Sequence, residues 1–175
     1  MVRKILPAKD PFLRQVAKPV AIIDKKILEV IKDLKDTLAV QKDPEGVGLA
    51  APQIGKNLRI FYLSYKGRSE VFINPEILYK APEKLISEEE NEKIMEGCLS
   101  LPYYYGSLLR SPEVKLKYTN ESGLEKIRKI SGFPAQIVQH EVDHLNGVLF
   151  VDKLLEQKKK LFKISNDEDW EEVDL

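Results

Sequence analysis

Gln139-His140-Glu141-Val142-Asp143-His144 places two imidazoles four positions apart, with a carboxylate directly after the first of them. Residues with this spacing lie on the same face of an α-helix, so both histidines can bind one metal ion from one side. In such an HExxH arrangement the histidines are ligands and the glutamate transfers protons. The chain has only 2 histidines, and both lie in this stretch. The sequence therefore predicts a metal-binding helix; the alternative is a solvated helix face with two histidines.

The composition favours one globular domain. A chain of 175 residues is long enough to bury a core without disulfides. We expect a single catalytic domain over residues 1–165 and an acidic, flexible tail over 166–175. Basic and acidic residues number 28 each, so no net field attracts DNA or an anionic membrane. One cysteine, no apolar run of transmembrane length and no signal peptide favour the cytoplasm, or an organellar matrix if a longer precursor exists.

Periodicity predicts the helices. A short helix is expected after Asp10, and Asp24 is expected to cap a longer one in which apolar residues repeat at helical spacing. Pro134 and Gly147 suit the first turn and the end of the metal-binding helix. A last helix is expected over residues 152–163, with Asp152 as its cap and a basic run at 158–160.

Apolar runs and apolar–polar alternation predict the strands. A charged, mostly acidic connection over residues 82–93, with Glu88-Glu89-Glu90 in a row, is expected to be solvated and mobile. The aromatic run Tyr103-Tyr104-Tyr105 fits either the core or the rim of a site. The expected strands are 58–63, 71–75 with a continuation at 77–79, a hairpin of 114–118 and 124–130, and 148–151.

Residues 46–55 form a segment rich in small residues. Its Gly, Ala and Pro content makes it a poor helix and a poor strand, but it allows close approach of a backbone. The segment lacks the Gly-Lys-Ser/Thr end of a phosphate-binding loop, which argues against nucleotide binding. Gln53 is the one polar side chain that it can present.

Two histidines do not complete a metal site, because catalytic zinc-type sites use three protein ligands and leave one position open. Metzincins place a third histidine downstream, but Phe150 occupies that position here. Thermolysin-like enzymes use a downstream glutamate, and Glu156 is one available candidate. Cys98 is the better candidate, since a thiolate is a strong, soft ligand, although a lone cysteine is often a small buried residue. Three strong ligands, where a structural site needs four, indicate an open catalytic site.

Three segments together resemble the signature motifs of the peptide deformylase family, in the family's order. They are Gly46-Val47-Gly48-Leu49-Ala50-Ala51-Pro52-Gln53, Glu96-Gly97-Cys98-Leu99-Ser100 and Gln139-His140-Glu141-Val142-Asp143-His144. The resemblance extends over nearly the whole chain, from residue 10 to residue 150. It implies an α+β fold with mixed or antiparallel sheets packed around a central HExxH helix, with N-terminal and C-terminal helices.

The resemblance also implies an activity. It implies a metal-dependent hydrolase of protein biosynthesis that removes the N-formyl group from the N-terminal formyl-methionine of newly synthesised polypeptides and releases formate. One divalent metal ion is implied, with Fe(II) as the native metal and Zn, Ni or Co able to replace it. The implied partners are N-formylmethionyl peptides, with transient association with the ribosome.

Roles for single residues follow from the same resemblance. Cys98, His140 and His144 are expected to hold the metal, and Glu141 to move a proton from water to the leaving amine. The Gln53 side-chain amide and the Leu99 backbone N–H are expected to stabilise the oxyanion. Gly48 is expected to let the substrate backbone run close to the loop. An apolar slot for the methionine side chain is expected from Val47, Ile94, Phe133 and Ile137, with core packing as the alternative for each.

Three further charged residues are candidates for supporting roles. Arg110 is expected either to bind the substrate backbone or to pair with an acid of the motifs. Glu96 and Asp143 are expected to accept hydrogen bonds from the histidine ligands.

Gln136 departs from the family pattern, where many members carry arginine, and this can alter a surface pair or the substrate rim. Two other functions stay open. One is a metallopeptidase whose third ligand is a carboxylate. The other is an inactive family member that binds ribosomal RNA through a basic helix over residues 158–160.

Overall fold

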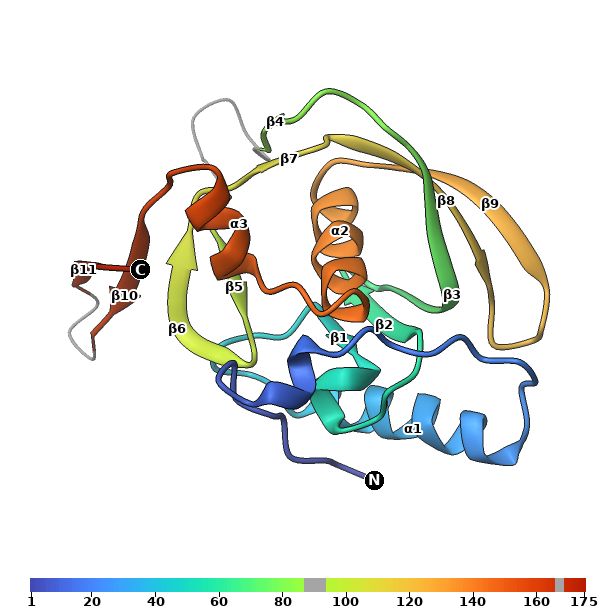
Figure 1. Cartoon of the computed structure of the whole chain (residues 1–175). Helices are drawn as coiled ribbons and strands as arrows, with labels where there is room; N and C mark the ends of the chain where they lie inside the picture. The colour runs from blue at the N-terminus through green and yellow to red at the C-terminus, as the bar shows by residue number, and fades with distance from the viewer. Residues whose placement is uncertain (87–93, 166–168) are drawn as a thin grey trace.

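The structure is a computed structural model that describes residues 1–86, 94–165 and 169–175. Its architecture is α+β with antiparallel sheets, which confirms the predicted fold class. The HExxH helix, α2 (Phe133–Leu145), lies at the centre of the fold, and α1 (Lys25–Ala39) lies at its base (Figure 1). No helix in the described part of the chain is long and apolar enough to cross a membrane.

Within the described ranges the strands form a large sheet of order β1-β2-β3-β8-β9, a second sheet of order β11-β10-β6-β5, and the pair β4-β7. The shorter helices are η1 (Pro11–Arg14), η2 (Ala51–Ile54) and α3 (Phe150–Glu156). The strands are β1 (Gly48–Ala50), β2 (Ile60–Tyr65), β3 (Arg68–Lys80), β4 (Lys84–Leu85), β5 (Glu96–Cys98), β6 (Leu101–Gly106), β7 (Leu109–Arg110), β8 (Glu113–Thr119), β9 (Glu125–Ser131), β10 (Leu161–Ile164) and β11 (Trp170–Val173).

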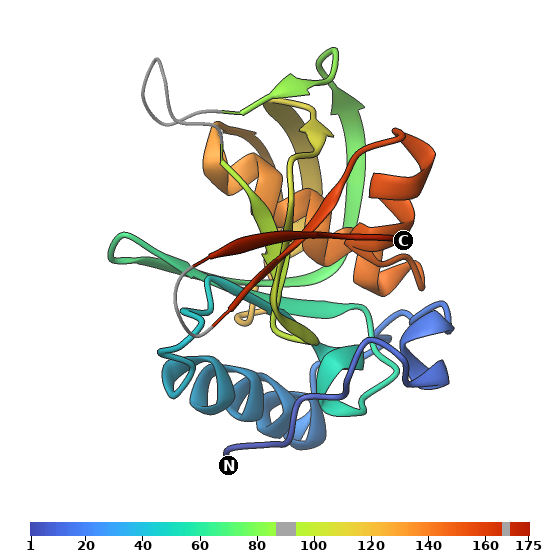
Figure 2. The same ribbon diagram turned by 90° about the vertical axis from the view of Figure 1, so that its left-hand side faces the viewer.

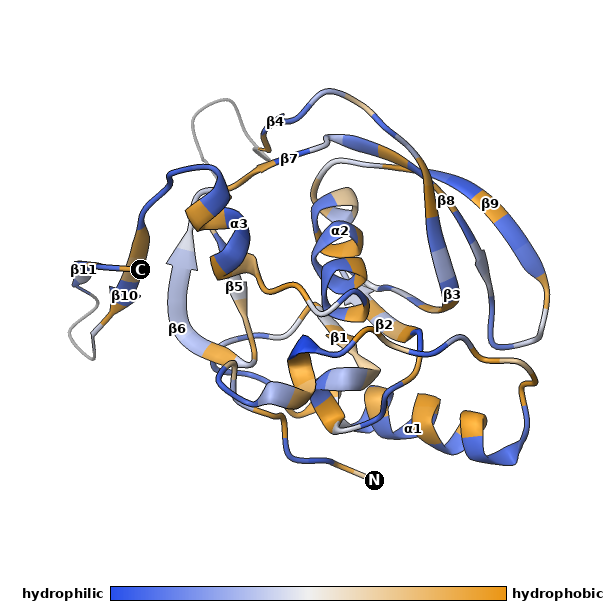
Figure 3. Cartoon of the chain, in the orientation of Figure 1, coloured by the Kyte–Doolittle hydropathy of each residue, from blue (hydrophilic) through white to orange (hydrophobic). Residues whose placement is uncertain are grey.

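Helix α1 begins where its cap predicts. The Asp24 carboxylate accepts a hydrogen bond from the Ile27 backbone N–H at 3.0 Å, which satisfies one of the free N–H groups of the first turn. Hydrophobic residues follow one side of the helix (Figure 3), and Ile31, Leu34 and Leu38 are buried from that side. The helix thus covers one face of the large sheet.

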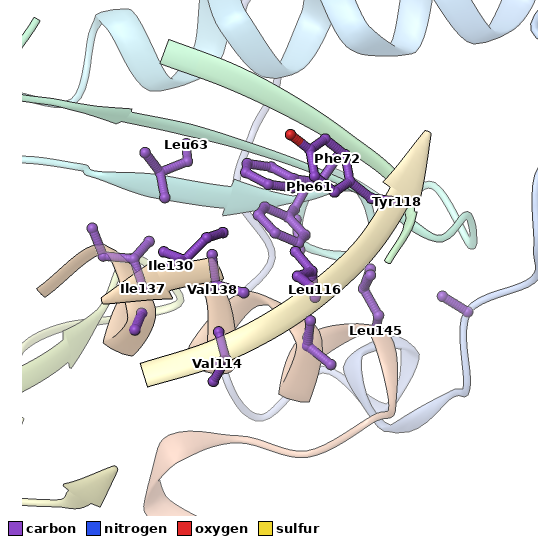
Figure 4. Packing of buried hydrophobic residues seen from close by; sticks show 14 residues of the cluster. Phe61, Leu63, Phe72, Val114, Leu116, Tyr118, Ile130, Ile137, Val138 and Leu145 are labelled. Carbon is purple, nitrogen blue, oxygen red and sulfur yellow. The ribbon is translucent and has the colours of Figure 1, made fainter. Parts of the chain in front are cut away.

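The opposite face of the large sheet packs against α2. Successive side chains of a strand point to opposite faces, so Ile60 belongs to the α1 layer and Phe61 to the α2 layer. Phe61 stacks on Phe72 of the neighbouring strand with ring centroids 4.5 Å apart. Figure 4 shows this aromatic pair facing Val138 of α2. The metal-binding helix is therefore fixed by a dense apolar layer.

The C-terminal end of α2 is fixed by a backbone turn. Gly147 has φ 74°, in the left-handed region that favours glycine. A Cβ added to Gly147 would lie 2.5 Å from the Arg14 carbonyl oxygen and 2.8 Å from its carbonyl carbon. The turn after the metal-binding helix thus needs glycine both for its conformation and for space.

We expect Gly147→Ala to lower the free energy of unfolding by more than the ~1–2 kcal/mol that left-handed geometry alone costs, because the methyl group meets backbone atoms. Gly55→Ala is the matched control, since Gly55 has φ 75° and no atom within 4 Å of an added Cβ. Urea unfolding of both variants measures the difference. Equal losses would show that the Arg14 backbone moves away without cost.

The region after Gly147 differs from the expected pattern. Residues 148–151 do not form a strand, because α3 begins at Phe150. Asp152 lies in the first turn of α3 and accepts a hydrogen bond from the Leu149 N–H at 2.8 Å, so it is not the residue before the helix. The expectation of a helix to residue 163 is wrong beyond Glu156, since Lys158 has φ 53° and the chain turns there into β10.

The two acidic segments also differ in part from the mobile connection and flexible tail that the sequence predicts. Trp170–Val173 forms β11, antiparallel to β10, where a flexible tail was expected. In the connection over residues 82–93, β4 pairs with β7 and Ile86 is buried. The Glu88-Glu89-Glu90 run and residues 166–168 lie outside the described residues.

Candidate metal centre and catalytic cavity

Cys98, His140 and His144 bring one sulfur and two ring nitrogens together. Their candidate ligand atoms all lie within 4.8 Å of one another, and the Cys98 Sγ is 3.3 Å from the His144 Nε2. The two histidines lie one turn apart on α2, with ring centroids 4.9 Å apart. Cys98 ends β5 at an irregularity in its pairing with β6. The three residues predicted as metal ligands thus meet at one point.

The donor set fits a divalent cation. Burial raises the pKa of the Cys98 thiol, but the neighbouring His144 and His140 rings outweigh burial and hold that pKa well below its usual value. A thiolate with two imidazoles is a donor set typical of zinc and of other first-row metals. The Glu141 Oε2 is buried and has no hydrogen-bond partner among the described residues. The site therefore offers three ligands and one free carboxylate oxygen beside them.

Glu96 orients the first histidine. Its Oε1 lies 2.6 Å from the His140 Nδ1, which leaves the Nε2 of that ring to bind a metal. The Arg110 Nε and Nη2 donate to the two Glu96 oxygens at 3.0 and 2.5 Å, and Nη1 donates to Asp143 at 2.6 Å. Burial raises the pKa of Glu96, but Arg110 and His140 lower it to about 2. Glu96 is therefore a charged acceptor that fixes the ring of His140.

This network bears on the expectations for Glu96, Asp143 and Arg110. The Glu96 carboxylate is hydrogen-bonded to the His140 ring, as expected. Asp143 was also expected to accept from a histidine, but its carboxylate pairs with Arg110. Arg110 is buried, pairs with Glu96 and Asp143, and is not among the residues that line the cavity described below, which favours the expected pairing with acids of the motifs.

Arg110→Met is expected to destabilise the metal-free chain by about 3–5 kcal/mol, because it leaves the Glu96 and Asp143 carboxylates without their cation. Arg128→Met is the matched control: Arg128 pairs with Glu70 on a half-exposed surface, where an ion pair contributes at most about 1 kcal/mol. Urea unfolding of both metal-free variants gives the comparison. A loss of the same small size in both would contradict the role given to Arg110.

Gln53 presents a donor to the site. Its Oε1 accepts a hydrogen bond from the Ala50 N–H at 2.8 Å, which orients the amide. Its Nε2 then points to the Ser100 Oγ at 3.1 Å and to the Cys98 Sγ at 3.6 Å. The Gln53 amide, which η2 carries, thus faces the proposed ligand Cys98. Leu99, whose backbone N–H is the second expected donor, lines the same cavity.

Gly48 and Glu141 fit against each other. A Cβ on Gly48 would lie 2.9 Å from the Ile137 Cγ2 and would overlap the Glu141 carboxylate. Burial raises the pKa of Glu141 to about 7, while the two histidine rings act in the opposite direction. Strand β1 therefore needs glycine at this position so that the Glu141 carboxylate can lie beside it.

Two of the proposed metal ligands, Cys98 and His140, line a cavity of about 280 Å³, together with Glu141. Phe133 lies at the start of α2, and Ile137 and His140 follow it along the helix. Gln136 is buried in the cavity wall and not on a surface. The expected residues that line the cavity are Val47, Gly48, Gln53, Leu99, Phe133 and Ile137, together with Cys98, His140 and Glu141.

Ile94 was expected to line the methionine slot, but it is not among the residues that line the cavity. The next residue, Met95, lines the cavity instead. Neighbouring residues of an extended chain point to opposite sides, so a placement by sequence alone is easily wrong by one position. The Ile94 N–H donates to the Ile86 carbonyl at 3.1 Å, which ties it to the segment after β4.

Other residues of the site were not predicted. Pro44, Glu45 and the aromatic run of β6 line the cavity, and only the aromatic run gave a signal in the sequence. Gln139, the residue before His140, is another residue whose role was not predicted. Its Oε1 accepts from the Ser111 N–H at 3.1 Å and its Nε2 donates to the Ser111 carbonyl at 2.8 Å. Gln139 thus ties α2 to the segment before β8.

Comparison with known proteins gives concordant matches. The family described as polypeptide deformylase matches residues 2–160. A peptide deformylase of Pseudothermotoga lettingae is 44% identical over 169 residues, which cover 94% of this chain and 92% of that protein. The crystal structure of a peptide deformylase from Legionella pneumophila has a TM-score of 0.78 and 39% identity, covering 88% of this chain and 86% of that one. A class I type b peptide deformylase of Acinetobacter baumannii, solved with Met-Ala-Ser bound, has a TM-score of 0.78 and 31% identity over 87% of this chain and 98% of that one.

Proposed function

The chain belongs to the polypeptide deformylase family, and from this premise we propose how its own residues remove the formyl group from formyl-methionyl peptides. The activity is that of a metal-dependent hydrolase of protein biosynthesis: water cleaves the formamide of the N-terminal formyl-methionine, and formate leaves. The observation that carries the assignment is the meeting of Cys98, His140 and His144, with a buried Glu141 that lines the same cavity as Cys98 and His140.

We propose that the cation is held by the Cys98 thiolate and the two histidine rings, and that Fe(II) is the native metal, replaceable by Zn, Ni or Co. When bound, such an ion polarises a carbonyl oxygen and makes water acidic enough to attack at neutral pH. The chain's own residues fix the ligands: Glu96 holds the His140 ring, and Arg110 holds Glu96.

Glu141 is proposed as the group that moves the proton. Its Oε2, which has no partner among the described residues, accepts the proton of the attacking water. The same carboxyl then delivers the proton to the amine nitrogen of the methionine as the C–N bond breaks, so that the atoms and charges balance. Positioned proton transfer of this kind contributes typically ~10²–10⁴-fold to a rate.

The oxyanion of the tetrahedral species needs donors that are already in place. The Gln53 amide is oriented by Ala50 and faces Cys98, and we propose that it donates to this oxygen together with the Leu99 backbone N–H. Removing one donor of this kind costs on the order of 10²–10³-fold in rate. The absence of a side chain at Gly48 lets the peptide backbone approach β1.

The methionine side chain is proposed to enter the apolar part of the cavity. Val47, Phe133 and Ile137 line it, and the aromatic ring of Phe133 contacts Tyr65 edge-on, with centroids 4.9 Å apart. An unbranched thioether side chain suits an irregular apolar slot. The relative from Acinetobacter baumannii, which was solved with Met-Ala-Ser bound, supports a peptide of this type as the ligand.

Formate release tests the proposal directly. The metal-loaded chain is expected to convert formyl-Met-Ala-Ser to Met-Ala-Ser and formate in equal amounts, and to leave acetyl-Met-Ala-Ser intact. Mass spectrometry of the peptide and an enzymatic formate assay give the two readouts. Cleavage of an internal peptide bond, with no formate, would instead indicate the metallopeptidase.

The choice of Fe(II) has its own test. Protein prepared without oxygen is expected to be more active than protein prepared in air, because oxygen oxidises the iron or the Cys98 thiolate. Metal content and formate release are measured on both preparations, with the zinc-loaded protein as a control that air leaves unchanged. Equal activity with iron bound in both preparations would contradict an oxygen-sensitive iron centre.

We propose that the enzyme acts in the cytoplasm and associates transiently with ribosomes, because its substrates are new polypeptide chains. The basic helix expected over residues 158–160 is not formed, and Lys160 pairs with Glu172 of β11 at 2.6 Å. These observations weigh against RNA binding through such a helix. Co-sedimentation with translating and with empty ribosomes tests the association.

A further inference from the structure

The hairpin of β10 and β11 adds two strands to β6 and presents aromatic side chains on one face of the sheet. Tyr105 lies opposite Phe162, and Trp170 lies opposite Ile164. The ring centroids of Tyr105 and Trp170 are 5.7 Å apart, and those of Phe162 and Trp170 are 6.4 Å apart. We call these three residues the aromatic face.

The other face of this sheet has a structural role. Leu161 is buried there, and Tyr104 and Val173 pack beside it against Leu154 of α3. Trp170, by contrast, is 51% exposed. Figure 2 shows the hairpin crossing in front of the strands that lead to the metal site. The aromatic face is therefore not needed to hold α3 in place.

Tyr105 joins the aromatic face to the catalytic cavity. It lines the cavity, and its ring packs directly on Gly97, where an added Cβ would lie 2.7 Å from the Tyr105 Cε1. Gly97 is the residue before the proposed ligand Cys98. The aromatic face thus begins one residue from the metal site and continues outward to Trp170.

The opposite side of the cavity mouth lies close to Tyr105. Pro44 and Glu45 line the same cavity. The pKa of Tyr105 is raised by burial and also by the charge of Asp43, the residue before Pro44. Tyr105 is therefore the residue of the aromatic face that also lines the cavity.

We propose that Trp170, together with Tyr105, forms a subsite for apolar side chains at the third or fourth residue of the formylated peptide. An extended peptide advances about 3.3 Å per residue, which is comparable to the 5.7 Å between the Tyr105 and Trp170 ring centroids when two residues are counted. Exposed aromatic rings bind apolar and aromatic side chains by stacking and by burial of apolar surface. This inference rests on the proposed function and adds a preference for the sequence of the nascent chain.

Trp170 lies beyond residue 160, where the match to the family ends. The subsite is therefore a property of the C-terminal hairpin of this chain. The neighbouring residue Glu171 is exposed on the opposite face of β11 and supplies a matched control.

The kinetic test compares two substrates, formyl-Met-Ala-Phe-Phe-amide and formyl-Met-Ala-amide, on the metal-loaded enzyme. The ratio of their kcat/KM values cancels any general loss of active protein. In Trp170→Ala this ratio is expected to fall about three- to tenfold, through a higher KM for the long peptide. Trp170→Phe is expected to keep most of the ratio, and Glu171→Ala all of it. A ratio in Trp170→Ala equal to that of the wild type would overturn the subsite.

A binding test does not depend on turnover, because the chain has only 1 tryptophan, Trp170. The fluorescence of the wild-type enzyme is expected to change saturably with the product peptide Met-Ala-Phe-Phe-amide and not with Met-Ala-amide. No change with the long peptide would reject contact with Trp170. If neither formyl peptide releases formate, the proposed function fails, while the fluorescence still decides whether the aromatic face binds peptide.

Discussion

Cys98→Ala is expected to lose its metal and its formate release together. Cys98 supplies the one thiolate of the three-ligand site, and its sulfur lies 3.3 Å from the His144 Nε2. Residues that only orient a metal ligand contribute about 10–100-fold to metal affinity. The loss of a ligand itself is therefore expected to weaken metal binding by more than about 100-fold, and activity falls with it.

Metal content and competition with a chelator measure the affinity, and formate release measures the activity. The wild-type chain, stripped of metal and then reloaded, is the control for handling. Urea unfolding of the two metal-free proteins separates loss of the metal from loss of the fold. We expect their free energies of unfolding to differ by about 1 kcal/mol, as for an ordinary substitution. A Cys98→Ala protein that keeps its metal would require a carboxylate ligand, as in the metallopeptidase alternative.

The parts of the site that the sequence predicts best are local. His140, Glu141 and His144 lie within one turn and a half of a helix, so the helical period alone places them on one face. Asp24 begins α1 for a similar reason, since a cap acts within its own turn. Such features can be predicted without knowing how the rest of the chain folds.

The features that depend on distant pairing were harder to predict. Cys98 lies 46 residues before His144, and only its chemistry and the family resemblance joined the two. The position of Arg110 between Glu96 and Asp143 depends on β7, β5 and α2 together. A local sequence pattern does not predict which of several acidic residues will form an ion pair with a buried arginine.

The errors after Gly147 have the same origin. A four-residue apolar run such as 148–151 fits a strand or a buried helix end equally well, and the packing of Phe150 and Leu154 in one cluster decides for the helix. The strand β11 carries Glu171 and Glu172, which suggested a solvated tail. Its pairing with β10, which itself pairs with β6, overrides that local preference.

Glu141→Gln is expected to retain its metal but lower kcat for formate release by about 10²–10⁴-fold. Glutamine has nearly the shape of glutamate, so it fits the space beside Gly48, but it cannot take the proton of the attacking water. Binding of the peptide does not use this proton, and KM is expected to stay close to that of the wild type. Glu171→Gln is the control, because Glu171 is exposed on β11 and is not among the residues that line the cavity. A Glu141→Gln enzyme of full activity would show that another group moves the proton, even with the metal correctly bound. Together with Cys98→Ala, which is expected to lose both metal and activity, this variant separates the residue that moves the proton from the residues that hold the ion.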